Sequence, residues 1–432
     1  MTKTISAEWR ARRLVDVAKV IPGYAFKSKD WCKKGIPVIK IKNIVGDLSV
    51  DTVEADCVPC ELLTAKLHKF VLNDGDILVA MTGATAGKVG RLRCKSSHLL
   101  NQRVAKLDPF DVDPLFFWAV VSSEEYQGRF FKLADGAAQP NMSGGQIEEV
   151  VLLVPSRNTQ RKIAAVLSAY DDLIENNTRR IAILEEMAQA IYREWFVHFR
   201  FPGHENVRFI ESPLGKIPEG WKATTLGDVV ELAYGKALKA DDRKPGPFPV
   251  YGSGGVVGFH DEAYTKGPGI IVGRKGNVGS VFWSDDDFYP IDTVFFVNTK
   301  VPLHYIYYNL ILSQSFLNSD AAVPGLNRNQ AYRNPFVLPS QDVLTSFENQ
   351  CSTLFSALRN LRKRNDNLRT TRDLLLPKLI SGQLDVEDLD IDTGENAVAD
   401  ASGSDLVCSE AVREGAGRSE PQASTPPRKK QS

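Results

Sequence analysis

Two long stretches of the chain place mostly apolar residues at alternating spacings of four and three. This is the a and d pattern of a coiled coil, so each stretch predicts a long helix with one apolar stripe. We call these positions the seam. The first seam consists of Ile163, Leu167, Tyr170, Ile174, Asn177, Ile181, Leu184, Ala188 and Ile191. The second consists of Phe347, Cys351, Leu354, Leu358, Leu361, Asn365, Leu368, Arg372 and Leu375.

The second seam follows the first by 184 residues, and so does a shorter match before it. Residues 140–156 (PNMSGGQIEEVVLLVPS) and 324–340 (PGLNRNQAYRNPFVLPS) share Pro, Gln, Pro and Ser at equal positions. Such a repeat predicts a duplicated fold. Each apolar stripe must be buried, so we expect the two helices to pair as an antiparallel coiled coil about a pseudo-twofold axis. Asn177 and Asn365 either fix the register of this pair or face solvent at a frayed stretch.

A different pattern precedes each helix, with short apolar runs separated by Gly, Pro, Asn and Asp. It predicts strands near residues 38–44, 77–81, 150–154, 270–272, 278–283 and 293–297. The expected fold class is therefore α+β, with two mixed α/β domains, each followed by a long helix. The expected boundaries are 1–155 and 221–340 for the domains, 156–200 and 341–384 for the helices, 201–220 for a linker and 385–432 for a tail.

Charge and composition narrow the class of protein. The 53 Lys and Arg residues balance the 53 Asp and Glu residues, but eleven acidic and five basic residues follow Gly382. We therefore expect a disordered acidic tail and a mildly basic body. No apolar run approaches a membrane span, the N-terminus lacks the apolar core of a signal peptide, and six cysteines are too few for a disulfide scaffold. These features favour the cytoplasm and no membrane association.

Motifs for enzyme chemistry are incomplete. GATAGK at residues 83–88 has three residues between its glycines where a phosphate-binding loop has four, and Val89 replaces the metal-binding hydroxyl. The third glycine of YGSGGVVG at residues 251–258 is one position late for a dinucleotide fingerprint. We expect no catalytic residue and no metal site. Four loosely spaced cysteines leave zinc open as an alternative: Cys32, Cys57, Cys60 and Cys94.

Several segments together resemble the specificity subunit of a type I restriction-modification system. They include PVIKIKNI (37–44), GDILVAMTGATAGKVG (75–90), NQRV (101–104), IIVGRKGNVGSV (270–281) and RTTRDLLLPKLISGQL (369–384). The resemblance implies a non-catalytic subunit in which two target-recognition domains each recognise one half of a bipartite DNA sequence. It also implies two methyltransferase subunits and restriction subunits as partners. S-adenosylmethionine, ATP and magnesium would bind to those partners and not to this chain.

Base recognition requires donors and acceptors on loops that reach a DNA groove. In the first domain the candidates are Lys40, Lys42, Asn43, Thr82, Thr85, Lys88, Asn101, Gln102, Arg103, Gln139 and Asn141. In the second domain they are Tyr251, Ser253, Arg274, Lys275, Asn277, Asn327, Arg328 and Asn329. Each could instead be a solvated loop residue or a turn former. Two other functions stay open at this point, a self-sufficient DNA methyltransferase or nuclease with an unrecognised site, and a coiled-coil scaffold.

Overall fold

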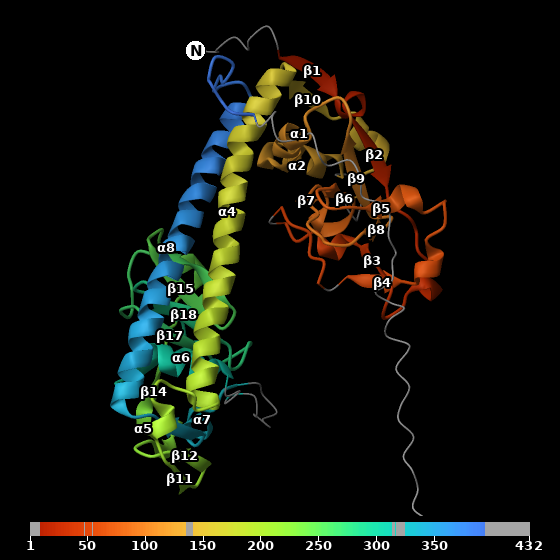
Figure 1. Ribbon diagram of the computed structural model, residues 1–432. Helices are drawn as coiled ribbons and strands as arrows, with labels where there is room; N and C mark the ends of the chain where they lie inside the picture. The colour runs from red at the N-terminus through yellow and green to blue at the C-terminus, as the bar shows by residue number, and fades with distance from the viewer. Residues whose placement is uncertain are drawn as a thin grey trace, which may run out of the picture.

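Two long helices form the axis of the molecule. The computed structural model describes residues 9–46, 48–53, 55–134, 141–312, 316 and 325–393. Helices α4 (Arg157–Tyr192) and α8 (Gln341–Ile380) lie side by side along most of their lengths (Figure 1). Ion pairs join Asp171 to Arg372 at 2.7 Å and Glu185 to Arg362 at 2.7 Å. Because the partner number falls as the α4 number rises, the helices are antiparallel, and the predicted pairing is confirmed.

Every position of the two predicted seams is buried or half-buried. The two asparagines meet in the interface, where Asn177 Nδ2 donates a hydrogen bond of 2.9 Å to Asn365 Oδ1. Asn365 Nδ2 in turn lies 3.2 Å from Thr178 Oγ1. Neither asparagine faces solvent, since they are 8% and 2% exposed. Arg372, which interrupts the second seam, keeps its charge compensated by Asp171.

The first domain contains two four-stranded sheets. In the first sheet each strand is antiparallel to its neighbours, in the order β2 (Ala18–Pro22), β9 (Val104–Pro109), β6 (Ile77–Ala80), β7 (Val89–Arg91). The second sheet has the order β4 (Asp56–Val58), β3 (Ile36–Ile39), β8 (His98–Leu100), β5 (Val71–Leu72), and its β3 and β8 are parallel. A separate antiparallel pair, β1 (Arg10–Arg13) with β10 (Val151–Val154), leads into α4.

The second domain repeats this topology. Its four-stranded sheet has the order β14 (Val230–Tyr234), β20 (Val294–Thr299), β17 (Gly269–Gly273), β18 (Val281–Ser284). A three-stranded sheet follows the order β16 (Gly255–His260), β15 (Phe248–Gly252), β19 (Tyr289–Pro290), again with one parallel pair, β15 and β19. Strands β13 (Lys222–Thr225) and β21 (Pro335–Leu338) pair before α8 as β1 and β10 do before α4. The predicted duplication is therefore confirmed.

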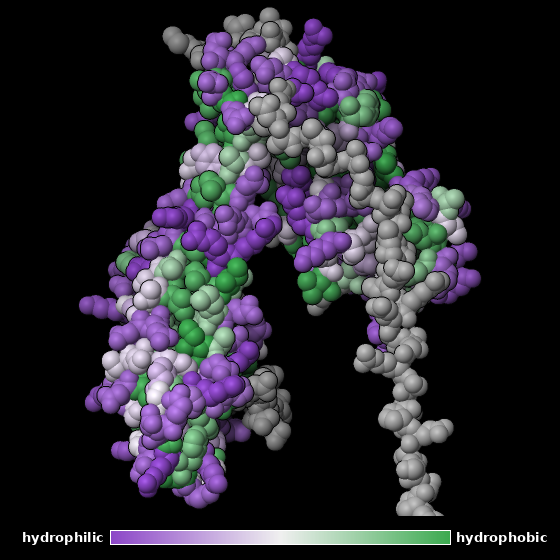
Figure 2. Space-filling view, in the orientation of Figure 1, coloured by the Kyte–Doolittle hydropathy of each residue, from purple (hydrophilic) through white to green (hydrophobic). Residues whose placement is uncertain are grey.

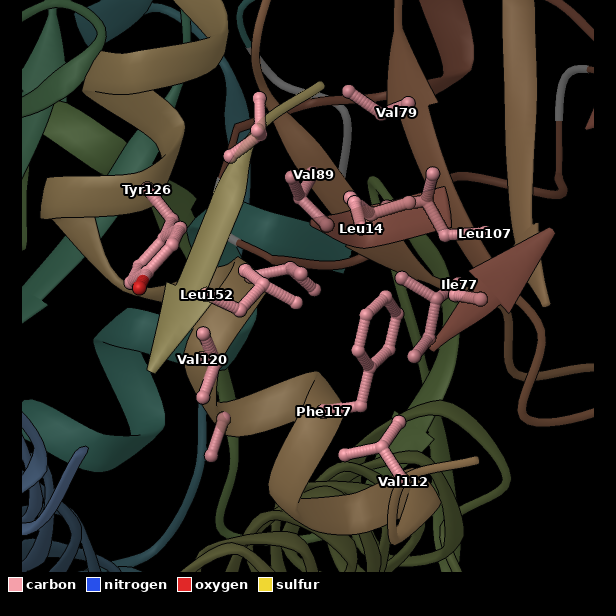
Figure 3. Packing of buried hydrophobic residues seen from close by; sticks show 14 of the residues in the cluster. Leu14, Ile77, Val79, Val89, Leu107, Val112, Phe117, Val120, Tyr126 and Leu152 are labelled. Atoms are coloured by element: carbon pink, nitrogen blue, oxygen red, sulfur yellow. The ribbon is translucent and has the colours of Figure 1, made fainter. Parts of the chain in front are cut away.

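Both long helices contribute to the core of each domain. In the first domain, Phe117 projects toward Ile77 of the sheet (Figure 3), and Ile163 of α4 and Leu379 of α8 complete the cluster. The second core includes Ala188 of α4 and Phe347 of α8. Shorter helices cover the sheets: α1 (Pro114–Ser122), α2 (Glu124–Leu133) and α3 (Gly144–Glu148) in the first domain, and α5 (Leu226–Val229), α6 (Leu303–Leu312) and α7 (Arg328–Tyr332) in the second. The two domains consequently lie at opposite ends of the helix pair (Figure 1).

The structure differs from the predicted boundaries at the linker and at the tail. The segment 201–220 contains a hairpin, β11 (Phe209–Ser212) and β12 (Gly215–Pro218), and its Ile217 is buried in the second core. Residues 385–393 of the predicted tail pack against the first domain, where Val386 is buried and Lys162 Nζ donates to the Glu387 carbonyl at 2.6 Å. The remainder of the predicted tail, 394–432, lies outside the described residues. None of the described helices is both long and apolar enough for a membrane span.

We expect Asn365→Ala to destabilise the protein, because it leaves the buried Asn177 amide without its partner. The cost of one unsatisfied buried amide is about 1–3 kcal/mol. The measurement is the midpoint of urea unfolding followed by circular dichroism. Asn367→Ala, on an exposed position of the same helix, is the matched control and should shift the midpoint little. Equal shifts in the two variants would show that the asparagine contact contributes nothing specific.

Candidate nucleic-acid interface

In the first domain, three loops from distant parts of the sequence meet at one edge of the sheet. Met81 follows β6, and its backbone N–H donates to the carbonyl of Arg103, between β8 and β9, at 3.0 Å. The Met81 carbonyl accepts from the N–H of Met142, just before α3, at 2.9 Å. We call these three joined segments the loop cluster. Backbone hydrogen bonds hold its three segments together.

The second domain forms the same loop cluster from equivalent segments. The N–H of Arg274 donates to the carbonyl of Thr293 at 2.9 Å, and the Arg274 carbonyl accepts from Leu326 at 2.8 Å. Lys275, which follows Arg274, also forms an isolated β-bridge with Gly325. This bridge is equivalent to the one between Thr82 and Asn141 in the first domain. Arg274 therefore occupies the place that Met81 has in the first domain.

The described candidates of the first domain lie on or beside its loop cluster. Thr82, Thr85 and Lys88 belong to the segment after β6, and Asn101, Gln102 and Arg103 to the segment before β9. Asn141 precedes α3, whereas Gln139 lies outside the described residues. Lys40 and the short 3₁₀ turn Ile41–Asn43 carry the remaining candidates, and they adjoin this edge because the Ile39 carbonyl accepts from the Asn101 N–H at 3.0 Å.

Two lysines of this edge share one carboxylate. Lys40 Nζ and Lys42 Nζ lie 3.0 and 3.1 Å from Asp56 Oδ2. Hydrogen bonds from both lysines hold the pKa of Asp56 below its ordinary value, so it stays ionised at neutral pH. Lys40 Nζ also lies 3.3 Å from the centroid of the Trp31 ring. Asp56 therefore offsets part of the positive charge that these lysines bring to the edge.

Asn43, Tyr251 and Asn327 use polar side-chain atoms in hydrogen bonds within the protein. Asn43 is 1% exposed, and its Oδ1 accepts from Lys40 N at 2.9 Å while its Nδ2 donates to the Asp51 carbonyl at 2.8 Å. Tyr251 is also buried, and its hydroxyl donates to the Trp283 carbonyl at 3.3 Å. The Oδ1 of Asn327 caps α7 by accepting from the N–H groups of Asn329 and Gln330 at 3.0 and 3.2 Å. The side chains of Asn43 and Asn327 therefore stabilise turns, whereas the Tyr251 hydroxyl joins β15 to β18.

The other candidates of the second domain are half-buried or exposed at its loop cluster. Ser280 Oγ donates to the Ser253 carbonyl at 2.7 Å, which joins the β15–β16 turn to the loop that carries Asn277. Lys275 Nζ lies 3.9 Å from Asp292 Oδ2, and Asn329 is exposed on α7. The guanidinium groups of Arg274 and Arg328 each lie 5.0 Å from the centroid of the Tyr234 ring.

Sequence reasoning missed the residues that orient these cations, namely Trp31, Asp56, Tyr234 and Asp292. Tyr234 is 49% exposed at the end of β14, yet its sequence neighbours give no sign that two arginines from distant loops meet it. The four cysteines considered for zinc are reduced, and Cys32 Sγ donates to the Lys34 carbonyl at 3.0 Å. Within the described ranges no three His, Cys, Asp or Glu residues are grouped as metal ligands.

Comparison with known proteins agrees with this arrangement of two related domains. Residues 6–186 and 218–331 match the family model described as the type I restriction modification DNA specificity domain. The chain belongs to this family. The first range covers the first domain and most of α4, and the second covers most of the second domain, so the duplication seen in the fold is a duplication of the specificity domain.

Individual specificity subunits align with most or part of the chain. The MjaIX specificity subunit of a type I restriction enzyme from Methanocaldococcus jannaschii is 24% identical over 89% of this chain and 95% of its own length. A putative type I specificity subunit from Mycoplasma pneumoniae is 31% identical over 40% of this chain and 46% of its own length. The crystal structure of the S subunit of a type I restriction-modification system from M. genitalium superposes with a TM-score of 0.56 at 19% identity, covering 88% of this chain and 98% of that one. At this identity the superposition supports the fold alone.

For Asn43→Ala we expect a loss of stability, because the substitution removes two buried hydrogen bonds of the turn after β3. The loss should be about 1–3 kcal/mol, seen as a thermal unfolding midpoint several degrees lower. Gln102→Ala, on an exposed position of the same edge, should leave the midpoint nearly unchanged. A normal midpoint for Asn43→Ala together with weaker DNA binding would instead make Asn43 a direct DNA contact.

Proposed function

We propose that each domain of this specificity subunit recognises one half of a bipartite, asymmetric DNA site, and that α4 and α8 set the distance between the halves. The observation that carries the proposal is the loop cluster, which has the same backbone connections in both domains but different side chains. Equal scaffolds place both clusters in equivalent positions, and unequal side chains select unequal sequences. The chain itself catalyses no reaction in this proposal, and the candidate residues on the loops contact bases or phosphates.

The lengths of the helices support a site of this kind. A symmetric dimer meets two half-sites about one helical turn apart, 34–36 Å. A 29-residue seam at 1.5 Å per residue spans about 43 Å. Figure 2 shows the molecule hollowed between the first domain and the body formed by the helix pair and the second domain. We therefore place the centres of the half-sites about one turn of DNA apart, with a non-specific spacer of roughly five to eight base pairs.

Methylation and cleavage are assigned to partner subunits, which bring S-adenosylmethionine, ATP and magnesium. In support of docking on the helix pair, Ile183 and Met187 of α4 are 56% and 47% exposed on a long helix between the domains. Ile183 also lines a groove formed by residues of both helices: Arg180, Ile183, Leu184, Ala357, Asn360, Leu361 and Arg364. Two methyltransferase subunits would bind here, restriction subunits would join them, and the complex would act on DNA in the cytoplasm.

The net charge of the chain also bears on its need for partners. A DNA-recognition subunit with low net charge fits a complex in which the partner subunits help to enclose the duplex.

Inserting one heptad into each helix, at matched positions beside Asn177 and Asn365, should lengthen the spacer and leave both half-sites unchanged. Seven residues add about 10 Å, which corresponds to about three base pairs at 3.4 Å each. The measurement is the DNA methylation motif found by single-molecule sequencing. A contiguous motif in the unmodified protein, or altered half-sites in the insertion variant, would contradict the proposal.

Asp56→Asn should strengthen DNA binding, because it frees Lys40 and Lys42 from their shared carboxylate. Each additional phosphate neutralised steepens the dependence of log K on log salt by about 0.9, so a salt titration should show a slope steeper by about one to two. Glu61→Gln is the control, since it removes an exposed carboxylate that pairs with neither lysine.

Replacing Arg274 and Lys275 by Ala should have the opposite effect and flatten the dependence of log K on log salt. Unchanged slopes in both experiments would remove these cations from the interface.

A further inference from the structure

Two arginines of the second domain share one tyrosine ring. The guanidinium carbons of Arg274 and Arg328 each lie 5.0 Å from the centroid of Tyr234. The three residues come from the loop after β17, the start of α7 and the end of β14. Tyr234 is 49% exposed, and both arginines are half-buried. The fold thus gathers two cations and an aromatic ring at the surface of the loop cluster.

Further contacts fix where these cations lie. Arg274 Nη1 donates to the Asp292 carbonyl at 2.8 Å. Arg328 also lies 5.9 Å from the ring of Tyr332, whose hydroxyl accepts from the N–H of Leu232 on the same strand as Tyr234. Within the part of the chain that the structure describes, neither guanidinium forms an ion pair with a carboxylate. Both groups are therefore held in place while most of their donors and all of their charge stay available.

At the three equivalent positions, all of which the structure describes, the first domain has no counterpart of this group, although its backbone is equivalent there. Met81 stands where Arg274 does, as the shared loop hydrogen bonds show. The N–H of Gly23 donates to the Val104 carbonyl, and the N–H of Gly235 donates to the Val294 carbonyl in the same way. The residues that precede these two glycines, Pro22 and Tyr234, are therefore counterparts. Ser143 caps α3 as Asn327 caps α7, so Gly144 stands in place of Arg328. A Cβ built on Gly144 would lie 3.2 Å from Pro22 Cγ, so this place is closely packed and uncharged.

We propose that Arg274 and Arg328, oriented by Tyr234, recognise guanine in the half-site of the second domain, and that the first domain lacks this mode of recognition. This inference rests on the proposed function of the two domains. Guanine presents two acceptors, O6 and N7, in the major groove, and the planar guanidinium matches both at once. A ring that holds the guanidinium plane before binding reduces the ordering cost of that bidentate contact. Tyr234 acts as a positioning residue and contacts no base itself.

The test uses the full chain assembled with methyltransferase subunits and a library of randomised DNA duplexes. The unmodified complex should select a bipartite motif in which one half contains guanine. Arg328→Ala should weaken the guanine preference in that half and keep the other half unchanged, which also identifies the half that the second domain recognises. Replacing the selected guanine by 7-deazaguanine, which lacks the N7 acceptor, should weaken binding of the unmodified complex. The loss should be a fraction of the roughly 5- to 150-fold that a full bidentate contact provides, because O6 stays available, and it should be smaller in the Arg328→Ala complex.

Three further variants separate base recognition from charge and from folding. Arg333→Ala removes an equal charge from the other end of α7 and should leave the motif unchanged. Arg328→Lys should keep the salt dependence but lose the guanine preference, because an ammonium lacks the planar fork. Tyr234→Phe keeps the ring and should keep the preference, whereas Tyr234→Leu should relax it in the same half as Arg328→Ala does.

Two outcomes overturn the inference while the proposed function stands. One is a bipartite motif without guanine in the half that Arg328→Ala alters. The other is an Arg328→Ala complex that binds all duplexes more weakly but keeps its base preferences, which would make Arg328 a phosphate contact. If the unmodified complex selects no bipartite motif at all, the proposed function fails and the inference fails with it.

Discussion

The antiparallel pairing of α4 and α8 is the constraint on which the rest of the structure depends. An isolated helix gains most of its stability from burial of its apolar face, and here each helix buries that face against the other and against a domain at each end. Ile163 and Leu379 enter the first core, while Ala188 and Phe347 enter the second. Neither core is complete without residues from both helices. The distance between the two loop clusters is consequently fixed by helix length and register, not by a flexible linker.

The asparagine contact shows how a duplicated chain can define that register. The pseudo-twofold repeat relates Asn177 to Leu361 and Asn365 to Ile181, so the symmetry-related layer of the seam is apolar. Because only one of the two symmetry-related layers is polar, the hydrogen bond between its asparagines forms in a single alignment of the helices. Sliding either helix by one heptad would bury one of the two amides against a leucine, either Asn177 against Leu358 or Asn365 against Leu184, with the cost of an unsatisfied polar group. The contact therefore favours one register at some expense of stability.

The sequence predicted the long helices and the duplication because both depend on periodicity, which a single chain displays directly. It also located the loops, since Gly, Asn and Pro punctuate them locally. It could not predict the roles of individual loop residues. Asn43 differs from an exposed asparagine only through hydrogen bonds to Lys40 and Asp51. Tyr234 acquires its arginines from segments about 40 and 94 residues away. Such contacts follow from the backbone hydrogen bonds of the loop cluster, which no sequence pattern encodes.

The backbone of the loop cluster is the same in the two domains, whereas the side chains that lie there differ. The three backbone connections of the loop cluster recur in both domains, yet the side chains there are Met81, Pro22 and Gly144 in one and Arg274, Tyr234 and Arg328 in the other. Tyr234 is 49% exposed, and substitutions at such surface positions usually change stability by less than about 0.5 kcal/mol. Met81 instead is 7% exposed and belongs to the first core, so a change of side chain there also affects the packing of that core. Because each domain carries its own loop cluster, the proposed function allows one half of a DNA site to change while the helix pair preserves the spacing and the other half.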